Sequence, residues 1–158
     1  MGGFLRIYLN DQLALGVGWR ELARRAAKAN RGTETGAALE RVATAVAEDV
    51  ETFAEIMARL GHRRNRVKTG LAVAGERAGR LKLNGRLGSY SPLSRFVELD
   101  VLVMGIEGKK ILWENLADLA GLRGRLPDVD FDELVARAER QRDELEPHRR
   151  AAASALRT

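Results

Sequence analysis

The sequence predicts an all-α fold, in which four long helices form a bundle and a long helical connection crosses over in the middle. Four stretches carry apolar residues at alternating spacings of three and four, the pattern of a helix with one buried face. Short breaks separate the first stretch from the second and the third from the fourth, whereas the middle connection is long. The chain has 158 residues, three prolines and no cysteine. We therefore expect one domain, residues 1–158, whose core needs neither disulfides nor thiolate-bound metal.

The first two helices are predicted over residues 4–29 and 34–60. Thr33 is a favourable N-cap residue for the second helix, and Gly32 before it can adopt a left-handed conformation. Gly61 supplies the stop signal. The apolar pattern of the first stretch consists of Leu5, Tyr8, Gln12, Leu15, Trp19, Leu22 and Ala26, and that of the second of Leu39, Ala43, Val46, Val50, Phe53, Met57 and Leu60.

The third long helix is predicted over residues 92–120. Ser91 followed by Pro92 is typical of an N-cap and the first helical position. The centre of this helix is apolar around most of its circumference, so we expect it to be the most buried of the four. The apolar residues of this centre are Phe96, Leu99, Val101, Leu102, Val103, Met104 and Ile106.

The last long helix is predicted over residues 130–156, with Asp128 or Asp130 as its N-cap. Pro147 removes a backbone donor within it and predicts a kink. Its pattern residues include two polar members, Gln141 and His148, which interrupt an otherwise apolar stripe.

The length of the middle connection predicts the topology. A weak helical pattern spans residues 66–86, although three glycines interrupt it. At about 1.5 Å per residue this segment reaches roughly 30 Å, so the chain can return to its starting end before the third long helix begins. A bundle with one such long crossover is the arrangement of ferritin-like proteins.

Three segments also resemble an uncharacterised family of small bacterial helical proteins, whose fold is associated with the ferritin-like superfamily. The segments are YLNDQLALG, GRLKLNGRLGSYSPLSRFVELD and GIEGKK, and the resemblance extends over most of the chain. It implies a ferritin-like four-helix bundle, and it implies no particular activity.

A standard di-iron site is excluded because the sequence contains no Glu-x-x-His motif. Counting residues along the predicted helices instead brings several polar side chains to one mid-bundle level, opposite Gly16 and Gly18. This candidate polar layer consists of Asp49, Glu107, Gln141, Glu144 and His148. It could form a degenerate metal site or a small-ligand site. We expect no bound metal and no cofactor.

The alternative for these residues is structural. Asp49 and Glu144 flank the apolar stripes, where acids commonly pair with arginines at the rim of a bundle. A glutamine in an apolar stripe often fixes register, and a glycine permits close packing. This interpretation is favoured over a functional layer.

The connector is strongly basic. Residues 63–86 contain eight cations and one acid, Glu76. Phosphate or nucleic acid could bind the cations Arg63, Arg64, Arg66, Lys68, Arg77, Arg80, Lys82 and Arg86. This binding is not favoured, because Tyr90 is the nearest aromatic and no stacking platform is evident. Solvation of an exposed crossover is the preferred explanation.

Other function classes find no support. The glycine-containing segments do not match a phosphate loop, and the serines have no triad arrangement. The segment Phe96–Trp113 contains five charged residues, which argues against a membrane span. The first residues lack the features of a secretory signal, so we expect a cytoplasmic protein. The leading hypothesis is a non-enzymatic bundle that acts through protein interactions, including homo-oligomerisation.

Overall fold

The computed structural model describes residues 3–83 and 90–157, and the side chains of residues 76–83 and 119 lie outside this description. The described residues form helices and no strand, which confirms the all-α prediction. The long helices are α1 (Gly3–Ala29), α2 (Glu34–Arg59), α3 (Arg66–Leu83), α4 (Pro92–Glu114) and α6 (Phe131–Ser154). The short elements are a π-helical turn, η1 (Asn115–Leu119), one α-helical turn, α5 (Leu122–Arg125), and a 3-10 turn, η2 (Ala155–Arg157).

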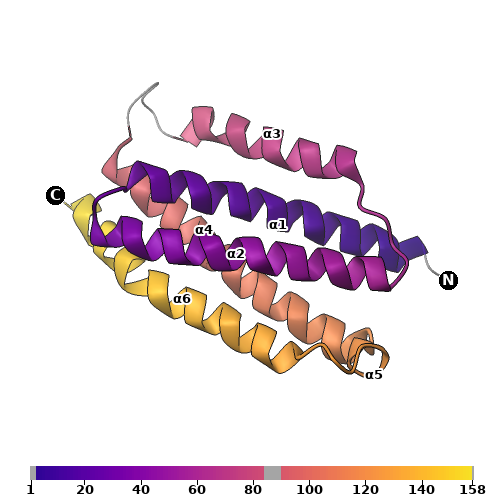
Figure 1. The fold of residues 1–158 in the computed structure, drawn as a ribbon. Helices are drawn as coiled ribbons and strands as arrows, with labels where there is room; N and C mark the ends of the chain where they lie inside the picture. The colour runs from indigo at the N-terminus through magenta and orange to yellow at the C-terminus, as the bar shows by residue number, and fades with distance from the viewer. Residues whose placement is uncertain (1–2, 84–89, 158) are drawn as a thin grey trace.

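Four of the long helices pack in pairs around a shared interior. α1 contacts α2 and α4, and α6 contacts the same two helices from the other side. Figure 1 shows α1 and α6 running in one direction and α2 and α4 in the other. α3 lies along the outside of α1 and runs parallel to it, so the middle connection returns the chain to the end at which α4 begins.

The residues that were predicted as N-caps cap the helices in the structure. Thr33 accepts a hydrogen bond from the Gly36 N–H at 3.0 Å and caps α2. Ser91 caps α4 in a capping box with Ser94, and Pro92 is the first helical residue, as predicted. Asp130, rather than Asp128, caps α6.

Glycine is required near the ends of α2 for two reasons: a left-handed backbone conformation and close packing against the backbone. Gly32 and Gly61 have φ values of 82° and 76°, which lie in the left-handed region that side chains disfavour. An alanine Cβ at Gly36 would lie 2.1 Å from the Asn30 carbonyl oxygen, so the turn packs directly against this glycine.

The boundaries of two helices differ from the predictions: those of the third long helix, α4, and of the crossover helix, α3. The α-helical part of the third long helix ends at Glu114, and the chain continues to Leu119 as a π-helical turn. Described helix α3 ends at Leu83, so residues 84–86 of the predicted crossover lie outside the described residues. α6 continues through Pro147.

Contrary to the prediction, α4 is not the most buried of the four helices, because more residues of α2 are buried. Leu99, Leu102 and Ile106 are buried, but the side chain of Met104 is 58% exposed. The helix contacts both α1 and α6, and Met104 remains largely exposed beside these contacts.

The apolar interior consists of two clusters along the length of the helices. One contains Leu13, Val50, Phe53, Leu112 and Trp113, and the other contains Leu39, Val46, Leu99, Leu102 and Ile106, each with further members. Asp49 of α2 therefore lies where the clusters meet, since its neighbours one turn away belong to different ones. None of the described helices combines the length and the apolar character needed to cross a bilayer.

Candidate functional site

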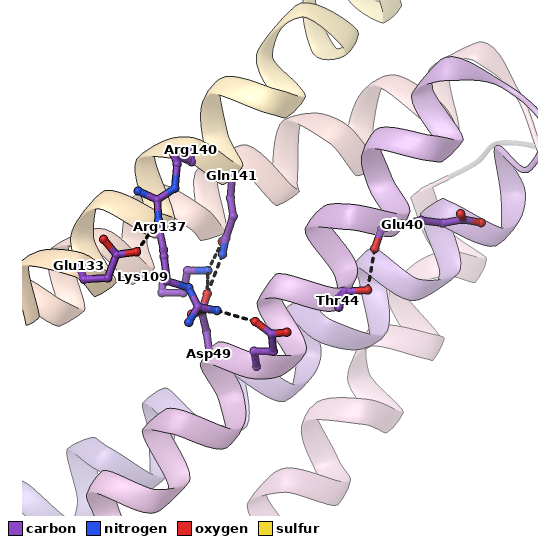
Figure 2. Close-up of polar contacts among 9 residues, drawn as sticks. Glu40, Thr44, Asp49, Lys109, Glu133, Arg137, Arg140 and Gln141 are labelled. Atoms are coloured by element: carbon purple, nitrogen blue, oxygen red, sulfur yellow. Dashed lines mark hydrogen bonds and ion pairs between the residues drawn. The ribbon is translucent and has the colours of Figure 1, made fainter. Parts of the chain in front are cut away.

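A buried carboxylate lies at the junction of the two apolar clusters. Asp49 is 2% exposed, and its Oδ2 accepts a hydrogen bond from Lys109 Nζ of α4 at 2.5 Å. Gln141 Nε2 of α6 donates to the same oxygen at 2.9 Å. Figure 2 shows Lys109 of α4 and Gln141 of α6 converging on Asp49 of α2.

Arg137 of α6 supplies a second cation to this cluster. Its Nη2 lies 3.2 Å from Asp49 Oδ1, in an ion pair without hydrogen-bond geometry, and 2.9 Å from Glu48 Oε2. The Glu48 side chain is 63% exposed, whereas that of Asp49 is buried. Asp49 is thus a buried anion between two cations, and Glu48 is a solvated partner at the surface.

Lys109 connects the network internally. Its Nζ also donates to Gln141 Oε1, so the amide both donates to Asp49 and accepts from Lys109. Burial lowers the pKa of the Lys109 ammonium, and the nearby Asp49 carboxylate opposes that shift. We describe Asp49, Lys109, Arg137 and Gln141 as the buried polar cluster.

The structure brings together two of the five residues of the candidate polar layer, Asp49 and Gln141. Glu107 pairs with Arg142 at 2.7 Å and Glu144 pairs with Arg41 at 2.5 Å, both at the partly exposed rim. His148 Nδ1 lies 3.0 Å from Thr35 Oγ1, in a separate contact between α6 and α2.

Lys109 and Arg137 were missed because counting residues gives the level of a side chain but not its direction. Lys109 lies only two residues from Glu107, yet it points toward Asp49 while Glu107 meets Arg142. A signal was present in the spacing: Leu102, Ile106 and Lys109 are separated by four and three residues, so Lys109 continues a buried stripe.

A cavity of about 330 Å³ opens beside the buried polar cluster, between α1, α2 and α4. Its lining is mainly apolar and aromatic, with Asp49 and Lys109 as its charged members. Three apolar lining side chains are about half exposed, namely Leu15 at 52%, Met104 at 58% and Ile111 at 53%. These three side chains place an apolar surface where the cavity meets solvent.

Small residues shape the walls of this cavity. Gly16, Gly105 and Gly108 line it, whereas Gly18 is not among the lining residues. A Cβ at Gly105 would lie 2.7 Å from two ring atoms of Trp19, so this glycine admits the indole. A Cβ at Gly108 would meet nothing within 4 Å, so space remains open there.

Both tryptophans of the chain line the cavity. Trp113 is 1% exposed and packs against Phe53 with ring centroids 5.8 Å apart. The Trp113 Nε1 donor is buried and has no hydrogen-bond partner among the described residues. A buried indole N–H usually has a hydrogen-bond partner, so an unsatisfied donor is unusual in a residue that lines a cavity.

Four of the eight cations of the basic connector line a hollow of about 560 Å³ at the start of α3, together with Arg6 and Asn10. Arg64 pairs with Glu51 at 3.2 Å and Lys68 with Asp11 at 2.6 Å, while Arg63 and Arg66 have no ion pair in the described part of the chain. The side chains of the other four candidates lie outside the described residues: Arg77, Arg80, Lys82 and Arg86.

Within residues 3–83 and 90–157, no three His, Asp or Glu side chains form a group that could hold a metal ion. Comparison with protein-family models, with curated proteins and with solved structures finds no match to this chain.

Proposed function

We propose that this chain is a non-enzymatic binding protein that takes up a small apolar molecule in the cavity between α1, α2 and α4. The observation that carries this proposal is the cavity itself. Its volume of about 330 Å³ falls at the lower end of the range of roughly 300–1,000 Å³ typical of small-molecule sites. Such sites combine an apolar lining with a few polar groups, and this cavity has Lys109 and Asp49 in an otherwise largely apolar wall.

The environment of Asp49 supports binding rather than metal chemistry. Two cations and an amide already occupy its surroundings, and a metal ion would have to displace them. The buried polar cluster instead joins α2, α4 and α6 and holds one wall of the cavity in place.

Tryptophan fluorescence tests the proposal, because both indoles line the cavity. Titration with 1-decanol, a neutral apolar probe, is expected to change the emission in a saturable manner. In Gly108→Leu, which adds a side chain where the cavity wall is open, this response should be lost. Gly70→Leu is the matched control, since Gly70 is exposed on α3 and does not line the cavity. A response that persists in Gly108→Leu would place binding elsewhere.

Self-association is a second candidate, supported by the exposed apolar side chains Leu15, Met104 and Ile111 around the same cavity. A second copy could cover them. Sedimentation equilibrium should then detect a dimer that Met104→Glu weakens and Leu93→Glu does not, because Leu93 is exposed on α4 away from the cavity. A purely monomeric protein over a wide concentration range would exclude this candidate.

We also propose that α1, α2, α4 and α6 form a four-helix bundle of the ferritin-like kind, with α3 as its crossover. The packing of α1 and α6 on the same two helices supports this assignment, as does the return path along α1. An experimental structure with a different helix order would refute it.

A further inference from the structure

Two residues that line the cavity carry hydrogen-bond donors for which the described part of the protein supplies no acceptor. Trp113 Nε1 is buried and has no hydrogen-bond partner among the residues that the structure describes. The Lys109 ammonium carries three N–H donors and contacts two acceptors, Asp49 Oδ2 and Gln141 Oε1. An indole N–H and an ammonium cannot accept hydrogen bonds, so only an acceptor atom can satisfy them.

The two donors lie on the same side of α4. Lys109 and Trp113 are four residues apart, which places their side chains next to each other on one helix face. Both also line the cavity. An acceptor group that enters between α1 and α4 and meets Lys109 would therefore lie beside the residue that carries the unsatisfied indole N–H.

The charges of the buried polar cluster favour an anionic acceptor. One buried carboxylate, that of Asp49, lies between the cations of Lys109 and Arg137. Among the described residues, Glu48 is the other acid that pairs with Arg137, and its exposed carboxylate is screened by solvent. Two acids thus pair with two cations, and the third N–H of the Lys109 ammonium remains as a charged donor, which binds a carboxylate more strongly than a neutral acceptor.

We propose that the cavity binds an aliphatic monocarboxylate. The carboxylate accepts hydrogen bonds from Lys109 Nζ and Trp113 Nε1, and the aliphatic chain packs against Trp19 and toward Met104 and Ile111. This inference rests on the proposed binding function and specifies the chemistry of the ligand.

Comparing three probes of equal chain length on the wild-type protein tests the inference directly. Decanoate, 1-decanol and decylammonium share the apolar chain and differ in the head group. We expect decanoate to bind about tenfold or more tightly than 1-decanol, because hydrogen bonds to a charged group are stronger than neutral ones. Decylammonium should bind more weakly than either, since its cation would face Lys109.

Variants of α4 assign the head-group contacts. Lys109→Met should abolish the preference for decanoate over 1-decanol, and Trp113→Phe should reduce it while Trp19 remains as the fluorescent reporter. Lys110→Met is the matched control: Lys110 pairs with Glu139, does not line the cavity and should leave the preference unchanged. Circular dichroism checks that each variant is folded, and the wild-type comparison decides the question if Lys109→Met is not.

The outcomes separate this inference from the proposed function. Equal binding of decanoate and 1-decanol, or an undiminished preference in folded Lys109→Met, would overturn the carboxylate inference and leave apolar binding intact. Failure of all three probes to bind would overturn both.

Discussion

Asp49 lies at the flank of the apolar stripe of α2, yet its side chain is buried, and its surroundings explain how the fold accommodates the charge. Removing one partner of a buried ion pair leaves the other charge uncompensated, which costs far more than the pair itself contributes. Loss of the Asp49 charge would affect Lys109 most. The Lys109 side chain is only 14% exposed, and the Asp49 carboxylate is its ion-pair partner.

We therefore expect Asp49→Asn to lower the free energy of unfolding by about 3 to 5 kcal/mol, measured by urea denaturation. The double substitution Asp49→Leu with Lys109→Met should cost less than the single one, because it removes both charges together. If Asp49→Asn proved as stable as the wild type, the carboxylate would not be the counterion of Lys109 in solution.

Two glycines of α4 form a matched pair. A Cβ at Gly105 would meet the Trp19 indole, whereas Gly108 is exposed and a Cβ there would meet nothing within 4 Å. Both lie inside the same helix, so replacing either with alanine brings the same gain in helix propensity, about 0.5 to 1 kcal/mol.

Gly105→Ala should nevertheless be less stable than Gly108→Ala by about 1 to 3 kcal/mol, because the added methyl group forces Trp19 to move. Urea denaturation measures the difference, and the Trp19 emission should shift only in Gly105→Ala. Equal stabilities would mean that the indole does not pack against Gly105.

At the scale of the helices, the N-terminal capping positions were predictable and the directions of side chains were not. Thr33, Ser91 and Asp130 act locally, through hydrogen bonds within their own turn, and so they could be recognised from sequence. The partner of Asp49 depends on how two helices are rotated against each other, which residue counting does not determine. Glu107 and Lys109 are only two residues apart on α4, yet Glu107 lies at the rim and Lys109 lies in the interior.

The cap of α2 gives a prediction at this scale. Thr33→Ala should reduce the free energy of unfolding by about 1 kcal/mol, because it removes the acceptor for the Gly36 N–H. Thr44→Ala is the control, since Thr44 is exposed in the middle of α2, donates to the Glu40 carbonyl at 3.0 Å and caps nothing. A loss of similar size in both variants would attribute the effect to the threonine side chain rather than to its capping position.

At the scale of the whole molecule, the cavity follows from the uneven packing of the helices. α1 and α2 pack closely, as do α4 and α6, but α1 and α4 make a smaller contact, and the cavity lies along it. The sequence predicted Gly16 and Asp49 at this level, but the favoured interpretation placed Asp49 at the rim, whereas it is buried, and the opening itself was not predicted. The shape of the cavity depends on Trp19 of α1 and on Gly105 and Gly108 of α4. No local sequence pattern shows that these residues of two helices lie together.

The central claim is that a ligand occupies this cavity with its acceptor group at Lys109 and Trp113. A crystal structure of the protein grown with 10-bromodecanoate tests it most directly, because anomalous scattering locates the bromine independently of the chain. The account predicts a carboxylate within hydrogen-bonding distance of Lys109 Nζ and Trp113 Nε1, and a bromine peak near Leu15, Met104 or Ile111. A bromine peak outside the space between α1, α2 and α4, or a cavity without the ligand at saturating concentration, would contradict it.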